Sequence, residues 1–329
     1  MADYESSLHG FLEEPVKYRG KVKIDPGRRV TSRGKRVIRR SPEVMVKITG
    51  NTKGVSHTGS HLDYISRNGD LKLENERGEV IEGKEAMKEL KEEWAVGQGR
   101  GRKNKRLTTN IILSMPKGTN TKGLVKAARG FASKTFGDNY QYVFVLHEDS
   151  EGENPHVHLT VRNLGFDGKR LHIKKGDPQI WRETFATELR WYGIDAEATP
   201  RAVRGVVKKG VSQVIKHIRK SGRTAQVDKD KVDEIIKEFA KKEQKEKPWE
   251  EKIINRQNVI RKLWLGTAQK LLKSKSQEDQ ELGNEIVDYV NTMPPLKTER
   301  HEMMEKMLDM TIKQEKEMQA KGNENGQER

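Results

Sequence analysis

The sequence predicts an α+β fold, in which a central antiparallel sheet with covering helices is followed by a helical C-terminal region. Up to about residue 222, short apolar segments typical of strands alternate with segments of helical spacing. From about residue 226 the chain consists of highly charged helical segments. The first 44 residues hold a broken run of Lys and Arg without a sustained period. We therefore expect a mostly disordered basic arm at 1–44, a sheet domain at 45–222 and helices at 226–329.

The individual elements follow from apolar spacing and from turn residues. Strands are expected at 44–48, 108–115, 140–147 and 155–161, with a hairpin of 71–73 and 79–81. Helices are expected at 60–67, 84–95, 121–136 and 178–192, and loops at 50–54 and 97–103. Gly205 and Gly210 argue against one long helix at 199–218. Further charged helices are expected at 227–247, 253–273 and 298–321, separated by prolines.

The composition favours a polyanionic partner. Only 33% of the residues are hydrophobic, 35% are charged, and the formal net charge is +16 with a pI of about 9.7. Cations placed on phosphates release condensed counterions, so such a surplus suits nucleic acid, although a basic surface can also serve solubility alone. No apolar run approaches the roughly 18 residues of a membrane-spanning helix, and the N-terminus has no signal-peptide core.

The sequence contains no cysteine. This excludes disulfides, thiolate catalysis and cysteine-based zinc sites. A metal ion would have to be bound by His, Asp, Glu, Asn or water. The absence of cysteine also fits a cytoplasmic protein.

Three histidines are expected to meet on one face of the sheet. His156 and His158 lie two residues apart in a predicted strand, so both side chains point to the same face. His147 ends the preceding strand, and a hairpin-like return through Gly152 would bring it beside the other two. Three imidazoles on one face form a metal cap with open positions for water or phosphate, whereas a His-x-His pair alone would be read as a polar strand face.

The metal and the surroundings of this cap are less defined. Mg²⁺ or Mn²⁺ would suit phosphoryl chemistry, although imidazole ligands otherwise favour Zn²⁺. Asp149 and Asn154, in the loop between the two strands, either orient the imidazoles or cap the loop.

A phosphodiester can be cut by activated water or by a side-chain oxygen. Tyr64 lies in His-Leu-Asp-Tyr-Ile-Ser-Arg, just after a loop rich in Gly and Lys, and by position alone it is typical of a half-buried helix tyrosine. The chain has six other tyrosines. The residues alone do not select a nucleophile among them.

Four segments resemble plasmid relaxases of the MOB-P type in the HUH endonuclease superfamily. Residues 147–161 match their three-histidine motif, His-x-Asp…Asn-Pro-His-x-His, at His147, Asp149, Asn154, His156 and His158. Residues 62–69 resemble the segment that carries the nucleophilic tyrosine, and 112–119 and 197–205 resemble two further motifs. The resemblance covers about 44–222 and has the motifs in the family's order.

The resemblance implies a DNA-nicking enzyme that initiates conjugative transfer. Tyr64 would attack a phosphate at a plasmid origin of transfer, form a 5′-phosphotyrosyl link and later reverse the reaction, with Asp149 assisting catalysis. The proton of Tyr64 could pass to Asp63, His61 or a metal-bound hydroxide, and these options stay open. Candidates for contacts to the DNA strand are Lys53, Arg67, Arg201, Arg204, Lys208 and Lys209.

Three other functions stay open beside this one. They are a rolling-circle replication initiator of the same superfamily, a metal nuclease that uses water, and a non-enzymatic DNA-binding protein with structural histidines. The first would be favoured by a second tyrosine close after Tyr64, and none follows there. The relaxase hypothesis further implies relaxosome accessory proteins and a type IV coupling protein as partners, a bacterial cytoplasmic location, and export with the DNA strand. The C-terminal helices could bind a partner or carry a secretion signal.

Overall fold

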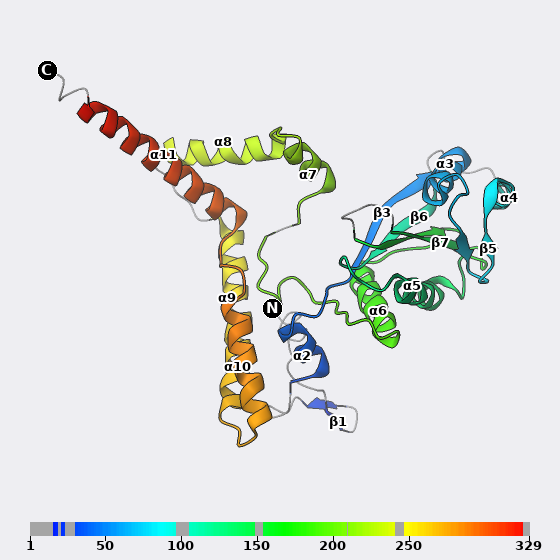
Figure 1. Ribbon diagram of the computed structural model, residues 1–329, viewed down its shortest axis with the longest axis horizontal. Coiled ribbons are helices and arrows are strands. Elements are labelled where there is room, and N and C mark those ends of the chain that lie inside the picture. Colours follow the sequence, from blue (N-terminus) through cyan, green and yellow to red (C-terminus); the bar gives the residue numbers. More distant parts are fainter. Residues whose placement is uncertain are drawn as a thin grey trace. The chain divides into compact units, whose positions relative to one another are not determined.

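The computed structural model describes residues 16–18, 21–23, 30–96, 105–148, 154–208, 210–240 and 247–324, with side chains from residue 30 to residue 313 within these ranges. The chain divides into two compact units. We call residues 40–199 the sheet unit, and residues 1–39 together with 200–329 the helical unit. Figure 1 shows the elements of both units.

The sheet unit is built on six antiparallel strands. They are β3 (Met45–Lys53), β4 (Leu73–Asn75), β5 (Val80–Ile81), β6 (Arg106–Ser114), β7 (Tyr142–His147) and β8 (His156–Arg162). Their order in the sheet is β3-β6-β8-β7-β4-β5, and every neighbouring pair is antiparallel. Strand β8 therefore lies between β6 and β7, inside the sheet. The predicted antiparallel sheet with covering helices is confirmed.

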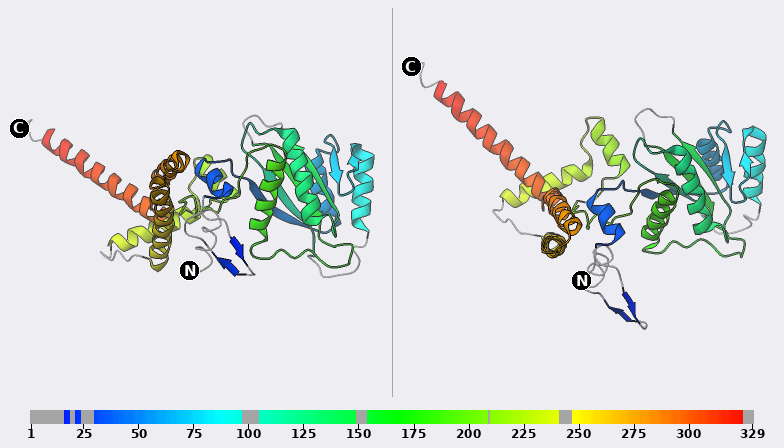
Figure 2. Two further views of the ribbon diagram at one scale, coloured as in Figure 1. Left: turned by 90° about the horizontal axis from the view of Figure 1, so that it is seen from below. Right: turned by 60° about the horizontal axis from the view of Figure 1, so that its bottom comes forward.

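Helices α5 (Thr121–Phe136) and α6 (Asp177–Trp191) cover one face of this sheet. The strands present apolar side chains to them at every second position, as in Val157, Leu159 and Val161 of β8. The ring of Phe131 packs 5.9 Å from that of Phe185, between the two helices. This face is the main apolar core of the unit (Figure 2, green helices).

Helices α3 (Val55–Ser66) and α4 (Gly83–Ala95) cover the opposite face. A smaller apolar cluster lies under them, formed by residues of α3, α4, β4 and β7. Over β3, β6 and β8 the same face is polar instead, with the buried side chains of Thr52, Thr108, His158 and Thr160. The two faces of one sheet thus differ in chemistry.

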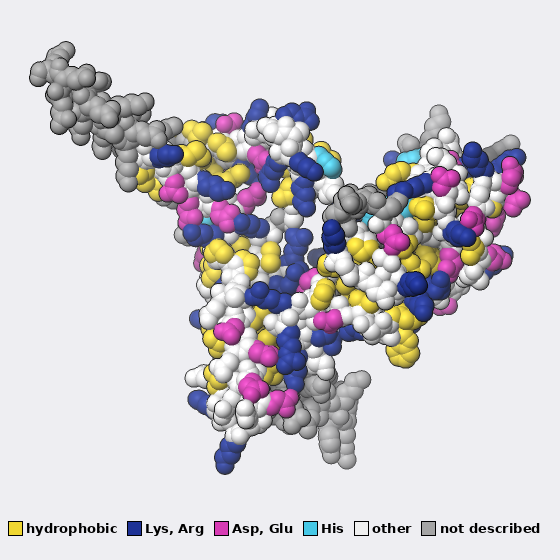
Figure 3. Space-filling model, viewed as in Figure 1, with side chains coloured by type: hydrophobic (Ala, Val, Ile, Leu, Met, Phe, Trp, Pro, Cys, Tyr) yellow, Lys and Arg dark blue, Asp and Glu magenta, His cyan; other side chains and the backbone are white. Residues whose placement is uncertain are grey.

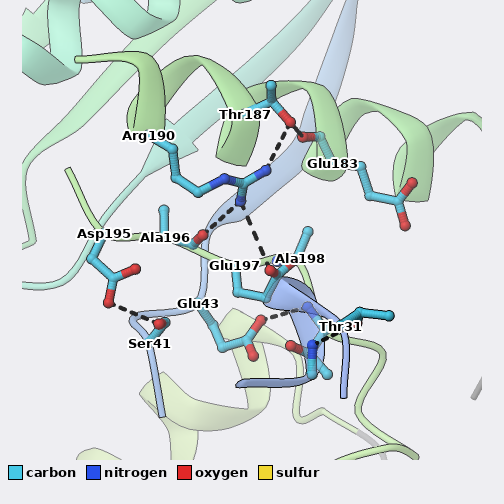
Figure 4. A network of polar contacts seen from close by, with 12 residues as sticks. Thr31, Ser41, Glu43, Glu183, Thr187, Arg190, Asp195, Ala196, Glu197 and Ala198 are labelled. Atoms are coloured by element: carbon cyan, nitrogen blue, oxygen red, sulfur yellow. Dashed lines mark hydrogen bonds and ion pairs between the residues drawn. The ribbon is translucent and has the colours of Figure 1, made fainter. Parts of the chain in front are cut away.

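The start of β3 is fastened to the segment that follows α6. Ser41 donates a hydrogen bond to Asp195 (2.7 Å), and the backbone N–H of Thr199 donates to Glu43 (2.8 Å). Arg190 of α6 donates to the carbonyl of Ala196 (2.7 Å). Figure 4 shows this network, which joins the first residues of the sheet unit to its last residues.

The helical unit contains a short hairpin and six helices in its described part. These are β1 (Val16–Tyr18), β2 (Lys21–Lys23), α2 (Ser32–Ile38), α7 (Gln213–Lys220), α8 (Gln226–Ala240), α9 (Pro248–Leu272), α10 (Gln277–Asn291) and α11 (Glu299–Glu324). Its core joins α2, α9 and α10 around the fully buried Trp264, whose ring packs 5.4 Å from that of Tyr289. Among the described residues, no helix combines the length and the apolar character needed to span a membrane.

Three features differ from the sequence-based expectations. Strand β3 does not end at residue 48 but runs to Lys53, because a register shift after Ile48 lets Gly50 pair with β6. Helix α3 starts at Val55, earlier than expected. Helix α10 was not predicted, although Ser276 caps its first turn and Leu282, Ile286 and Val290 recur at helical spacing.

The division of the chain also differs from the expected boundaries. Within the expected arm, residues 32–38 form α2, whose Val37 and Ile38 are buried in the helical core. The expected boundary near 222–226 moves to Thr199, because the carbonyl of Val203 accepts hydrogen bonds from Trp264 Nε1 and Tyr289 Oη, both at 3.4 Å. Residues 1–15, also part of the expected arm, lie outside the described residues.

Candidate active site

The three predicted histidines meet on the α3 side of the sheet. His147 of β7 is paired with His156 of β8. Two residues further along β8, His158 is paired with Val145 of β7. The ring centroids are 5.5 Å apart for His147 and His156, 5.0 Å for His156 and His158, and 4.4 Å for His147 and His158. One ring nitrogen of each lies within 4.8 Å of the others, which is a spacing that can hold a metal ion. The strand alternation thus assembled the cluster that the sequence predicted.

Two of these imidazoles are buried and therefore favour the neutral form. Burial lowers the pKa of His158 to about 3, assisted by His147, His156 and His61. Burial also lowers the pKa of His147, with a smaller opposing effect of its hydrogen bond to Ile65. Neutral imidazole is the form that binds metals, so no proton competes at these two side chains near neutral pH.

The hydrogen bonds of the cluster leave nitrogens available as ligands. A backbone carbonyl only accepts, so His147 donates through Nε2 to Ile65 O (2.7 Å) and His156 donates through Nδ1 to Asn154 O (3.0 Å). Each ring then keeps a lone pair on its other nitrogen. His158 Nε2 is buried and has no hydrogen-bond partner among the described residues. This set of nitrogen ligands fits a divalent metal ion, because a bound cation would give the buried His158 Nε2 the partner that it lacks.

Tyr64 lies beside this cluster, near the end of α3. Its ring is edge-on to that of His158, with centroids 6.0 Å apart and an interplanar angle of 90°. The side chain is 66% exposed, whereas its neighbour Ile65 is fully buried and holds the helix on the apolar cluster. A large exposed tyrosine next to three imidazoles is reachable by a polymeric substrate.

The end of α3 is shaped by a left-handed turn. Arg67, Asn68 and Gly69 have φ values of 52°, 57° and 94°. A side chain at Gly69 would also meet the backbone of Gly83 at 2.9 Å, so only glycine fits there. The backbone N–H groups of Arg67, Asn68 and Gly69 bond the carbonyls of residues 64, 63 and 66. His147 bonds the carbonyl between them, that of Ile65, so a candidate metal ligand caps the helix that carries Tyr64.

The candidate proton acceptors for Tyr64 have other partners. The carboxylate of Asp63 forms an ion pair with Lys91 of α4. His61 lies one turn before Tyr64, with ring centroids 6.4 Å apart, and its Nε2 is 3.0 Å from the hydroxyl of Thr160. Burial, with a contribution from His57, lowers the pKa of His61 to about 4, so its imidazole is neutral at pH 7.

A row of threonines beside His61 was not singled out from the sequence. The hydroxyl of Thr52 is 2.7 Å from those of both Thr58 and Thr108, which ties α3 to β3 and β6. Threonine is common in strands for its β-branched shape, so its presence gave no functional signal. The signal available was position, because Thr160 follows His158 by two residues and so shares its face.

The other predicted site residues fall into three groups. Asp149 and Lys209 lie outside the described residues. Asn154 contacts the cluster through its backbone carbonyl, while its side chain accepts a hydrogen bond from Lys117 N (3.1 Å). Of the predicted DNA contacts, the sheet unit holds two and the helical unit holds the rest. The first two are Lys53 and Arg67, and the described others are Arg201, Arg204 and Lys208.

Lys208 is less available than expected, since it forms an ion pair with Glu302 of α11. Arg67 lies close enough to His147 to contribute to the lowering of its pKa. The positive charge of Arg67 therefore acts on the histidine cluster. Figure 3 shows His at the surface of the sheet unit, with Lys and Arg side chains next to it.

Comparisons with known proteins find relatives of the segment that contains this site. The family described as relaxase, MobA/VirD2-like, nuclease domain, matches residues 64–194. The T-DNA border endonuclease VirD2 of Rhizobium radiobacter is 28% identical over 191 residues, covering 52% of this chain and 45% of that protein. VirD2 of Agrobacterium fabrum is 26% identical, with 52% and 42% covered. The chain thus spans less than half the length of these curated relatives.

Two solved structures are also similar, at lower levels. The conjugative relaxase TrwC in complex with oriT DNA, in its metal-bound form, is 13% identical with a TM-score of 0.33, covering 77% of this chain and 100% of that chain. A structure from work on vancomycin resistance transfer in Staphylococcus aureus is 15% identical with a TM-score of 0.32, covering 49% and 99%. The family match spans Tyr64 and all three histidines, so residues 64–194 of this chain are similar to the nuclease domain of MobA/VirD2-like relaxases.

Proposed function

We propose that this protein nicks and rejoins one DNA strand at a specific site in an origin of transfer, and so initiates conjugative transfer. The observation that carries the proposal is the position of Tyr64, whose exposed ring lies 6.0 Å from that of His158 in the histidine cluster. The proposed nucleophile therefore lies beside histidines that could hold a phosphate-binding cation. The similarity to T-DNA border endonucleases supports the same reaction class.

The reaction exchanges one phosphoester for another. The Tyr64 oxygen forms a bond to phosphorus, the bond from phosphorus to the 3′ oxygen breaks, and the proton of the phenol leaves as the 3′ oxygen gains one. The products are a 5′-phosphotyrosyl link and a free 3′-hydroxyl. Because the new link retains the ester, attack by a 3′-hydroxyl on it rejoins the strand without ATP. A water-using nuclease would leave no such link.

His147, His156 and His158 would hold the metal ion of this reaction. The ion would stabilise negative charge on the non-bridging phosphate oxygens, and Mg²⁺ or Mn²⁺ are the ions that we propose. The chain's own contribution is to keep the imidazoles neutral by burial and to orient two of them with the carbonyls of Ile65 and Asn154.

The DNA strand is proposed to contact several cations of the chain. Arg67 ends α3 next to Tyr64, whereas Lys53 ends β3 just before the other end of the same helix. Arg201, Arg204, Lys208 and Lys209 are proposed as further contacts from the helical unit. Accessory and coupling proteins are proposed as partners, together with a cytoplasmic location and export with the strand. Asp149 remains a proposed catalytic residue.

Covalent capture tests this function. Single-stranded oligonucleotides tiled across the DNA around the gene are incubated with the protein and Mg²⁺ or Mn²⁺, and the products are separated on a denaturing protein gel. We expect one oligonucleotide to form a covalent adduct with the wild-type chain and with Tyr192→Phe, which alters an exposed tyrosine in the turn that ends α6. Tyr64→Phe should form none. Cleaved ends without an adduct would contradict the proposal and favour a water-using nuclease.

A further inference from the structure

We propose that His61 is a positioning residue, whose hydrogen bond to Thr160 fixes the place of Tyr64 relative to the histidine cluster. The inference rests on the proposed function and concerns the same site. It assigns a role to a side chain outside the expected ligand set, through a contact of 3.0 Å between His61 Nε2 and Thr160 Oγ1.

One face of α3 makes a series of polar contacts with the sheet. Thr58, His61 and Ile65 follow each other at spacings of three and four residues, so they share that face. Thr58 bonds Thr52 of β3, His61 bonds Thr160 of β8, and the carbonyl of Ile65 bonds His147 of β7. The helix is therefore attached to three different strands by directional bonds.

Directional bonds matter here because the apolar packing under α3 is small. In the cluster below it, Leu62 and Ile65 are the α3 side chains. Apolar contacts resist the separation of a helix from a sheet but are non-directional. They therefore fix the position of the helix along its own axis less well than hydrogen bonds do. Thr160 is fully buried, so its hydroxyl requires a partner and holds His61 in place.

The geometry links this bond directly to the reacting pair. Along α3, His61 and Tyr64 are one turn apart, and along β8, His158 and Thr160 are two residues apart on the same face. Two neighbouring contacts therefore join α3 to β8. One is the bond between His61 and Thr160, and the other is the contact between Tyr64 and His158, whose rings are 6.0 Å apart. A shift of α3 along β8 would change both separations together.

Rate and affinity measurements on matched variants test this role. His61→Phe and Thr160→Val each remove the bond, whereas His61→Gln and Thr160→Ser each keep a group that can form it. His57→Phe is the control, because His57 is an exposed histidine one turn earlier on the same helix. For each variant, we would measure the rate constants of adduct formation and of religation, the dissociation constants of the oligonucleotide and of Mn²⁺, and the pH profile of the rate.

We expect His61→Phe and Thr160→Val to slow adduct formation and religation by the same factor, about ten- to a hundredfold, as a misplaced reacting group does. The two dissociation constants should stay within about twofold, and the double variant should be no slower than the slower single one. His61→Gln, Thr160→Ser and His57→Phe should react at close to the wild-type rate, with an unchanged pH profile.

Several results would overturn the inference. They are a wild-type rate in His61→Phe, additive losses in the double variant, or a His61→Gln variant that is as slow as His61→Phe. In the last case a changed pH profile would identify His61 as a proton acceptor. If a variant with Phe or Val fails to bind Mn²⁺, the Gln and Ser variants still decide, because the inference requires them to be active. A wild-type chain that forms no adduct would instead contradict the proposed function.

Discussion

The two faces of the central sheet have the same strands but different tasks. In β8, Val157, Leu159 and Val161 point into the apolar core under α5 and α6, while His156, His158 and Thr160 point toward α3. Burial of the first set stabilises the sheet, which allows the second set to hold polar groups that contribute little to stability. The alternation of one strand thus separates the apolar core from the candidate active site, within seven residues.

The largest expected effect comes from removing a candidate ligand on the reactive face. His158→Ala should lose Mn²⁺ binding and reduce adduct formation by more than the ~10–100-fold that loss of a ligand's supporting partner costs. Calorimetric Mn²⁺ titration and the adduct assay measure this. His172→Ala, which replaces an exposed histidine, is the control. Normal Mn²⁺ binding by His158→Ala would contradict the assignment of the cluster as a metal site.

The opposite face should respond in stability rather than in chemistry. Phe131 is fully buried between α5 and α6, so Phe131→Ala should lower the free energy of unfolding by about 3–5 kcal/mol. Urea unfolding followed by circular dichroism would measure the loss. Under conditions where the variant remains folded, its affinity for Mn²⁺ should match that of the wild type. A weaker affinity there would mean that the two faces are not separable as we describe.

Acid should weaken the fold through the reactive face. The pKa of His158 is about 3 in the folded chain and near 6.5 when unfolded, so between these values the unfolded chain binds more protons. The free energy of unfolding should therefore be unaffected above pH 6.5 and fall as the pH is lowered below it. In metal-free protein, His158→Gln should reduce this dependence, whereas His172→Gln should not. Equal slopes in urea unfolding for wild type and His158→Gln would contradict the cause that we assign.

The smallest effects should come from the cations at the two ends of α3. Arg67→Ala and Lys53→Ala should each weaken binding of single-stranded DNA modestly and reduce the salt dependence of log affinity by about one unit or less. Fluorescence anisotropy at several salt concentrations measures both. Lys175→Ala, an exposed cation in the turn before α6, should leave the slope unchanged. A variant at Arg67 or Lys53 that behaves like Lys175→Ala does not contact the strand.

Much of this arrangement was predictable from the sequence, for identifiable reasons. The histidine cluster follows from the two-residue period of a strand and from a short return between β7 and β8, both of which are local properties. The sheet and its helices follow in the same way from apolar spacing. Tyr64 was selected by family resemblance, because its local sequence is that of an ordinary helix residue.

The parts that were not predicted depend on contacts distant in sequence. The bond between His61 and Thr160 joins residues 99 positions apart, and that between His147 and Ile65 joins residues 82 apart. The boundary at Thr199 depends on Val203 being bonded by Trp264 and Tyr289. No local pattern shows such pairings. Helix α10 is a different case, because its apolar spacing was present in the sequence and was obscured by its many charged residues.

The central claim is that Tyr64 itself receives the DNA, and peptide mapping of the covalent adduct tests it most directly. The adduct formed by the wild-type chain would be digested with trypsin, which cleaves after Lys53 and Arg67, and with a nuclease. The peptides would then be identified by mass spectrometry. We predict that the nucleotide remnant is attached to Tyr64, in the peptide that spans residues 54–67. A remnant on any other residue, or strand cleavage with no modified peptide, would contradict the account.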